Sequence, residues 1–125
     1  MSVLRRYCVG ALVCTLLPFG ARAQELPSGQ TVTLQEVLVD EVNAESWLRF
    51  RFIAPRIARA GGDISYGDAA ADMEQLCADV ALPYIAQYTL TGDAIVISLA
   101  DQETEFGDTN PDATQFFDVF RVKDD

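Results

Sequence analysis

An acidic run between two apolar segments holds the spacing most suggestive of chemistry, Asp108-Thr109-Asn110-Pro111-Asp112. The pattern D-x-N-x-D begins many calcium loops, because it places three oxygen-bearing side chains on one side of a turn. The rest of such a loop is missing, since Ala113 stands where glycine is needed and Val119 where a bidentate glutamate is needed. We therefore favour a proline turn with a local hydrogen bond to Asp108, and keep Asp108, Asn110 and Asp112 as weak metal candidates.

Four arginines are close together in the sequence: Arg49, Arg51, Arg56 and Arg59. They form a cluster of positive charge in a chain whose formal net charge is -10. Arginine suits bidentate recognition of carboxylates, so one interpretation is the docking of an acidic partner or ligand. The alternative, which we favour, is cross-strand pairing with acids such as Glu36.

The side chains needed by most hydrolases are missing from the sequence. It contains no histidine, which excludes Ser-His and Cys-His pairs and the usual catalytic zinc sites. Lys123 is the only lysine, and Gly61-Gly62 lacks the context of a phosphate loop. A paired-acid site could be assembled from Asp101, Glu103 and Glu105, but a solvated acidic loop is the simpler interpretation. The sequence thus predicts no enzyme and no cofactor.

Residues 1–23 have the features of a secretory signal peptide. Arg5 and Arg6 precede an apolar run from 7 to 19, and Ala21-Arg22-Ala23 supplies an A-x-A cleavage signature. The apolar run is shorter than the roughly 20 residues of a membrane-spanning helix. We expect cleavage after Ala23 and a periplasmic or secreted domain, residues 24–125, that is not held in a membrane.

Cleavage would change both the charge and the cysteine content. Loss of Arg5, Arg6 and Arg22 takes the net charge from -10 to -13, which disfavours nucleic acids and anionic lipid surfaces as partners. Cys8 and Cys14 would also leave, so Cys77 could not form an internal disulfide. We expect a buried, inert thiol at Cys77 rather than an intermolecular disulfide.

The apolar patterns predict one α+β domain. Strands are expected at 31–40, 47–53, 94–100 and 115–122, with a polar loop at 41–46 and a short turn after Pro55. A helix capped by Ser65 or Asp68 is expected to end at Pro83. Its apolar stripe would comprise Ala69, Met73, Leu76, Cys77 and Val80, and its polar face Asp68, Asp72, Gln75 and Asp79. The order β-β-α-β-β favours a mostly antiparallel four-stranded sheet with one main helix packed on it.

Several short motifs carry a family resemblance: Ala71-Asp72-Met73-Glu74, Leu82-Pro83-Tyr84, Glu105-Phe106-Gly107 and Ala113-Thr114-Gln115-Phe116-Phe117. With these, the chain resembles a family of small uncharacterised exported proteins of alphaproteobacteria, classed as a domain of unknown function. The likeness extends from about residue 26 to 122 and implies a periplasmic domain with no known activity.

The sequence leads to two hypotheses about function. The first is a non-enzymatic interaction module of the periplasm with an unknown protein partner. The alternative is a small-ligand or calcium-binding module that uses the acidic loop 101–112.

Overall fold

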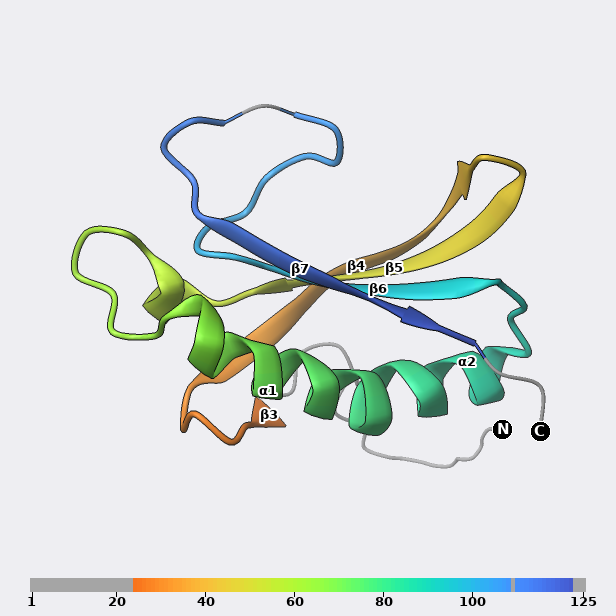
Figure 1. The fold of residues 1–125 in the computed structure, drawn as a ribbon, viewed down its shortest axis with the longest axis horizontal. Coiled ribbons are helices and arrows are strands. Elements are labelled where there is room, and N and C mark those ends of the chain that lie inside the picture. The colour runs from red at the N-terminus through yellow and green to blue at the C-terminus, as the bar shows by residue number, and fades with distance from the viewer. Residues whose placement is uncertain (1–23, 109, 123–125) are drawn as a thin grey trace, which may run out of the picture.

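A computed structural model describes residues 24–108 and 110–122, in which one helical layer covers one face of a sheet (Figure 1). The long strands are β4 (Thr31–Val42), β5 (Glu45–Ile53), β6 (Ala94–Ala100) and β7 (Gln115–Arg121). The two-residue strand β3 (Gln24–Glu25) extends the sheet beside β4, giving the order β3-β4-β5-β6-β7. The α+β class is therefore confirmed. The predicted signal peptide, residues 1–23, lies outside the described residues.

Strands β4 and β5, which contain the strands expected at 31–40 and 47–53, form an antiparallel hairpin. The expected polar loop at 41–46 is wrong, because both strands run on to a tight turn at Asn43 and Ala44. These two residues have φ values of 50° and 67°. Positive φ at both central positions matches the twist of a hairpin and closes it without a longer loop.

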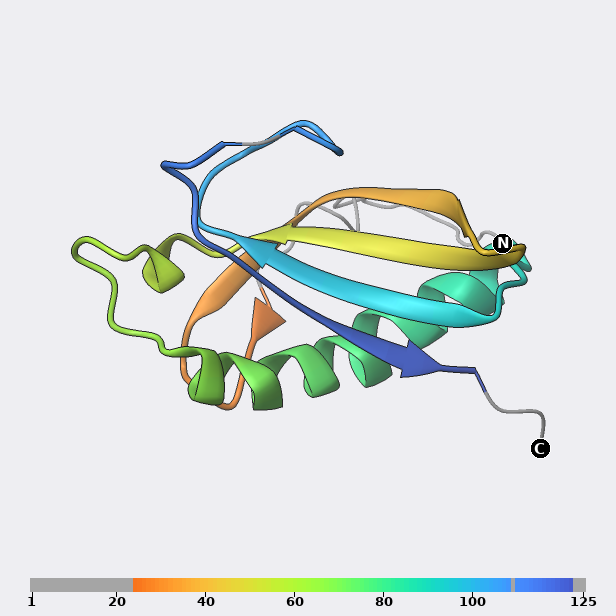
Figure 2. The ribbon, with the colours of Figure 1, turned by 45° about the horizontal axis from the view of Figure 1, so that its top comes forward.

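The sheet is mixed, so the prediction of a mostly antiparallel sheet is only partly right. The pairs β4–β5 and β6–β7 are antiparallel, but β5 and β6 are parallel. The helical segment lies between β5 and β6 in the sequence and crosses one face of the sheet (Figure 2). A crossover of this kind returns the chain to the end where β5 began, and β6 must then run in the same direction as β5.

The helical segment continues past Pro83, where the sequence predicted its end. Helix α1 (Tyr66–Leu76) leads into a π-helical turn, η3 (Cys77–Ala81), and then into α2 (Leu82–Tyr88). Pro83 lies in the first turn of α2, a position where a proline is tolerated. The π-helical turn before it is wider than an α-helical turn, so the helical segment can continue past the proline. Within 24–108 and 110–122, no helix has the length and apolar character needed to cross a bilayer.

The predicted cap of the main helix and the predicted short turn after Pro55 are both confirmed. Ser65 is the N-cap, and its side chain accepts a hydrogen bond from the Asp68 amide. The short turn after Pro55 is the 3-10 helix η2 (Pro55–Ile57). The predicted apolar stripe is buried in full, and it packs with the inward side chains of β5 and β6 as one hydrophobic cluster.

Asp72 was expected on the polar face of the helix, but its side chain is 0% exposed. It lies beneath the segment between β3 and β4, which crosses this side of α1. The Asp72 carboxylate accepts hydrogen bonds from the backbone N–H and hydroxyl of Ser28 and from the amide of Gln30. The helical period alone could not reveal this, because the covering segment comes from a distant part of the sequence.

Cys77 is buried, as predicted, and burial raises the pKa of its thiol. Because the thiolate is the reactive form, a raised pKa reduces its population at neutral pH. We expect an aromatic disulfide reagent to label Cys77 slowly at pH 7.5 and rapidly once urea unfolds the protein. The rate in the native state should rise as the pH increases toward the raised pKa. Fast labelling of folded protein at pH 7.5 would contradict this expectation.

Candidate functional site

The face of the sheet opposite α1, here called the open face, carries the predicted arginine pair. Strand register places three cross-strand rows on this face. The rows are Glu36, Arg51, Ser98 and Phe117; Leu38, Arg49, Val96 and Val119; and Asp40, Trp47, Ala94 and Arg121. Arginines, acids and aromatic rings therefore lie side by side on the open face.

Both arginines of β5 form ion pairs with the neighbouring strand. Arg51 pairs with Glu36, and Arg49 Nε lies 2.9 Å from an oxygen of Asp40. This confirms the cross-strand pairing that the sequence favoured. Because these pairs occupy part of the guanidinium donors, they weaken the argument for an acidic partner, whose docking here stays a prediction.

The other two predicted arginines lie beyond the end of β5 and do not join this pair. Arg56 pairs with Asp63 at 2.7 Å, and Arg59 donates to the carbonyl of Pro111 at 2.6 Å. The four residues therefore do not form one basic patch. Arg59 instead ties the region around η2 to the loop that follows β6.

That loop, residues 101–114, is closed at its base and attached to the sheet further along. At its base, the Asp101 N–H donates to the Thr114 carbonyl, and the Thr114 N–H donates to the Asp101 carboxylate at 2.9 Å. Further along, the buried Thr104 carbonyl accepts from Arg51 Nη2 at 2.9 Å and from the Gln35 amide at 2.8 Å. Arg51 thus connects β4, β5 and the loop, although it is only 6% exposed.

A pocket of about 560 Å³ lies between this loop and the open face, and we call it the aromatic pocket. Aromatic rings line it from three elements: Trp47 on β5, Phe106 in the loop, and Phe117 on β7. The Arg49 guanidinium carbon lies 5.2 Å from the centre of the Phe106 ring and 5.7 Å from that of the Trp47 ring. These distances are within the range of cation–π attraction, so Arg49 helps to fix both rings.

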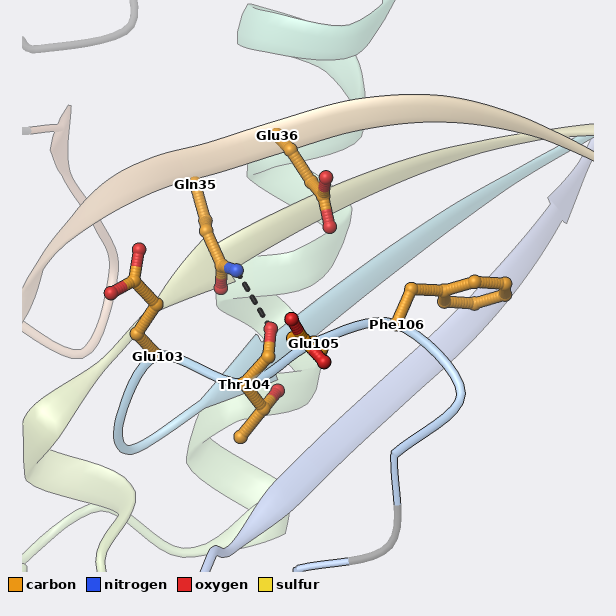
Figure 3. A pocket seen from close by; sticks show the side chains of 6 residues that line it. All are labelled: Gln35, Glu36, Glu103, Thr104, Glu105 and Phe106. Atoms are coloured by element: carbon orange, nitrogen blue, oxygen red, sulfur yellow. Dashed lines mark hydrogen bonds between the residues drawn. The ribbon is translucent and has the colours of Figure 1, made fainter.

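A second hollow, of about 580 Å³, adjoins the aromatic pocket, and we call it the acidic hollow. Its lining residues are Gln35, Glu36, Glu103, Thr104, Glu105 and Phe106. Glu105 and Phe106 line both spaces and form the ridge between them. Figure 3 shows the Phe106 ring turned away from the carboxylates of the acidic hollow.

Two charged residues at the rim of the open face, Glu45 and Arg121, fix the orientation of the Trp47 side chain. The Glu45 carboxylate accepts from Arg121 at 2.9 Å and from the Trp47 indole N–H at 3.0 Å. Hydrogen bonds from Arg121, and secondly from Trp47, lower the pKa of Glu45. The carboxylate therefore stays ionised over the neutral range and keeps the indole oriented.

The weak metal candidates, Asp108, Asn110 and Asp112, lie beyond the ridge in the same loop. The predicted turn is present, but its side-chain acceptor is Asn110 instead of the predicted Asp108: the Asn110 side-chain oxygen accepts the Asp112 N–H at 3.0 Å. In the part of the chain that the structure describes, no group of three or more His, Cys, Asp or Glu side chains is gathered for a metal ion. Of the three loop acids considered for hydrolysis, Asp101 accepts the Thr114 N–H, while Glu103 and Glu105 line the acidic hollow.

Sequence reasoning missed Thr104, Phe106 and Phe117 as site residues. Trp47 could have been found, because residues 47, 49 and 51 alternate with apolar residues, which places Trp47 on one face of the strand together with Arg49 and Arg51. The loop residues gave no such signal, since their position depends on how residues 101–114 fold back over the sheet.

Fold and site together define a small α+β domain with two adjoining hollows on the helix-free face of a mixed sheet. The chain belongs to a family of unknown function, DUF6497, whose model matches residues 12–125. No curated protein matches the chain, and no solved structure matches it. The expected resemblance to a domain of unknown function is thereby confirmed.

Proposed function

We propose that this chain is an exported, non-enzymatic interaction domain that binds a protein partner through its open face. The observation that carries the proposal is the aromatic pocket, whose Phe106 and Phe117 side chains are 48% and 61% exposed. Rings left in water beside a pocket cost free energy in an isolated domain, and aromatic side chains are enriched where proteins meet.

Export is supported by the sequence of the first 23 residues. The basic pair, the apolar run and the A-x-A signature occur in the order of a secretory signal. A partner would accordingly be met in the periplasm or outside the cell.

The proposal of a non-enzymatic role rests on the side chains that the chain offers. It has no histidine, and Cys77 is buried in the cluster beneath the sheet rather than in either hollow. Among the described residues, the charged groups at the open face are carboxylates and guanidinium groups, which suit recognition by charge and hydrogen bonds.

A second candidate is the binding of a small ligand by loop 101–112. It is favoured by the size of the aromatic pocket, about 560 Å³, which falls in the usual range for small-molecule sites, roughly 300–1,000 Å³. Within the same loop, calcium is the weaker choice because the Asn110 oxygen already accepts the Asp112 N–H.

The experiment compares Phe117→Ser with Tyr88→Ser, two substitutions of exposed rings on different parts of the surface. Tagged full chains would be expressed and exported, cross-linked in the periplasm and purified. We expect one protein to accompany the wild type and the Tyr88→Ser variant and to fall about tenfold with Phe117→Ser, as loss of a central aromatic contact typically costs more than 1 kcal/mol.

Two results would contradict the proposal. One is a partner that is retained equally by both variants, because the open face would then not be the contact. The other is native mass spectrometry that finds a small molecule on the purified wild type but not on Phe117→Ser, with no protein captured. That result would favour the second candidate.

A further inference from the structure

We propose that the partner presents an extended segment with an apolar side chain for the aromatic pocket and a lysine or arginine for the acidic hollow. This inference rests on the proposed function and adds the chemistry of the partner. It follows from the position of the two hollows, from the charges left unmatched there, and from the way the site already holds a guanidinium group.

The position of the hollows argues for one segment that occupies both. They share Glu105 and Phe106, so a chain crossing this ridge meets both spaces in succession. Figure 3 shows the Phe106 ring projecting from one side of the ridge and the acidic side chains gathered on the other. In an extended segment, residues i and i+2 project to the same side, so a pair with this spacing can enter both hollows.

The charges at the site argue for a cationic segment. Arg51 and Arg49 are already paired with Glu36 and Asp40. In contrast, the side chains of Glu103 and Glu105 have no ion pair or hydrogen bond with another described residue, and both are exposed. The surplus charge at the ridge is thus negative, on a chain of net charge -10, and a basic segment is its complement.

Arg49 indicates what kind of cation the ridge accepts. Its guanidinium group lies near the Phe106 and Trp47 rings and is balanced by the Asp40 carboxylate. On the other side of the ridge, the carboxylates of Glu103 and Glu105 can play the part that Asp40 plays for Arg49. An incoming arginine would find there the guanidinium–carboxylate pairing that the domain uses internally.

A second copy of this chain is a poor occupant, because two chains of net charge -10 repel each other. A segment with acidic residues is equally disfavoured by Glu103 and Glu105. Both occupants are treated below as outcomes of the test.

The test uses Trp47, which lines the aromatic pocket and is the only tryptophan in the sequence. Its fluorescence would be followed while the protein, purified after expression of the full chain, is titrated with blocked pentapeptides. The first peptide carries arginine two positions from phenylalanine. In the second, glutamate replaces the arginine, and in the third, serine replaces the phenylalanine.

We expect saturable binding of the first peptide and about tenfold weaker binding of each of the others, which corresponds to about 1.4 kcal/mol. Binding of the first peptide should also weaken when salt rises from about 0.05 M to about 0.5 M, because exposed charges are screened. Equal or tighter binding of the glutamate peptide, or the absence of any saturable change with all three peptides, would overturn the inference.

The role of the two carboxylates in binding a basic residue is tested by the double substitution Glu103→Gln, Glu105→Gln. Its matched control is Glu74→Gln, Asp79→Asn, which removes the same charge from the exposed side of the helical segment. We expect the first pair to remove the preference for arginine over glutamate and the control to keep it. Equal effects of the two pairs would mean that net charge alone acts, which would overturn the inference.

Failure here is distinguishable from failure of the proposed function. If the peptides show no charge preference while capture of a partner still depends on Phe117, only the chemistry assigned to the partner is wrong. If capture does not depend on Phe117, the proposed use of the open face is wrong as well. Binding of the purified protein to a second copy would be recognised by a mass of twice the chain and would likewise overturn the inference.

Discussion

Replacement of Asp72 by alanine is expected to lower the free energy of unfolding by about 3 kcal/mol. The carboxylate is fully buried and accepts from the Ser28 backbone, the Ser28 hydroxyl and the Gln30 amide. Its loss would leave the buried Gln30 amide without its acceptor and free the segment before β4. Each buried donor left without an acceptor costs about 1–3 kcal/mol. Urea unfolding followed by far-ultraviolet circular dichroism would measure the change.

Asp79→Ala is the matched control, because Asp79 lies on the same helical segment but is exposed. Its effect should stay within about 0.5 kcal/mol, as is usual for surface positions. Asp72→Asn should fall between the two, since one amide oxygen can still accept. Equal stability of the Asp72→Ala and Asp79→Ala proteins would show that the buried hydrogen bonds do not hold the segment before β4.

Arg51→Met is expected to lower the free energy of unfolding by about 2 kcal/mol and to release loop 101–114 from the sheet. The change removes the donors to the carbonyl and hydroxyl of Thr104 and breaks the pair with Glu36. Breaking a buried ion pair usually costs about 3–5 kcal/mol. We expect less here because the Glu36 side chain is 40% exposed and its carboxylate can be rehydrated.

The measurement is hydrogen exchange together with urea unfolding. Exchange should become faster in loop 101–114, with little change in α1. Arg56→Met is the control, because its pair with Asp63 is exposed and its loss should leave the urea midpoint nearly unchanged. Unaltered exchange in the loop of Arg51→Met would show that Thr104 is held by other contacts.

The parts of the fold that the sequence predicted are those governed by local periodicity. The apolar run at 94–100 is the strand β6, with the predicted bounds, and the helical stripe from Ala69 to Val80 is buried. The parallel pairing of β5 and β6 could not be read locally, because it depends on the path of the crossover. The predicted end of the helix at Pro83 was wrong because a π turn before the proline allowed the helical segment to continue.

The candidate site was predictable to a similar extent. The strand expected at 47–53 contains Arg49 and Arg51, and the expected cross-strand pairing with Glu36 is confirmed. The aromatic pocket required tertiary information, because Phe106 reaches it only after the loop turns back over the sheet. Asp72 was misplaced because its covering segment, around Ser28, is remote in sequence.

The closure of loop 101–114 at its base separates the length of the loop from the register of the sheet. Asp101 and Thr114 hold the ends of the loop together independently of the residues between them. Because the cost of closing a loop rises only slowly with its length, residues beyond the Thr104 attachment can be lengthened, shortened or exchanged while β6 and β7 keep their register. The scaffold can therefore tolerate changes of sequence and length in this single segment.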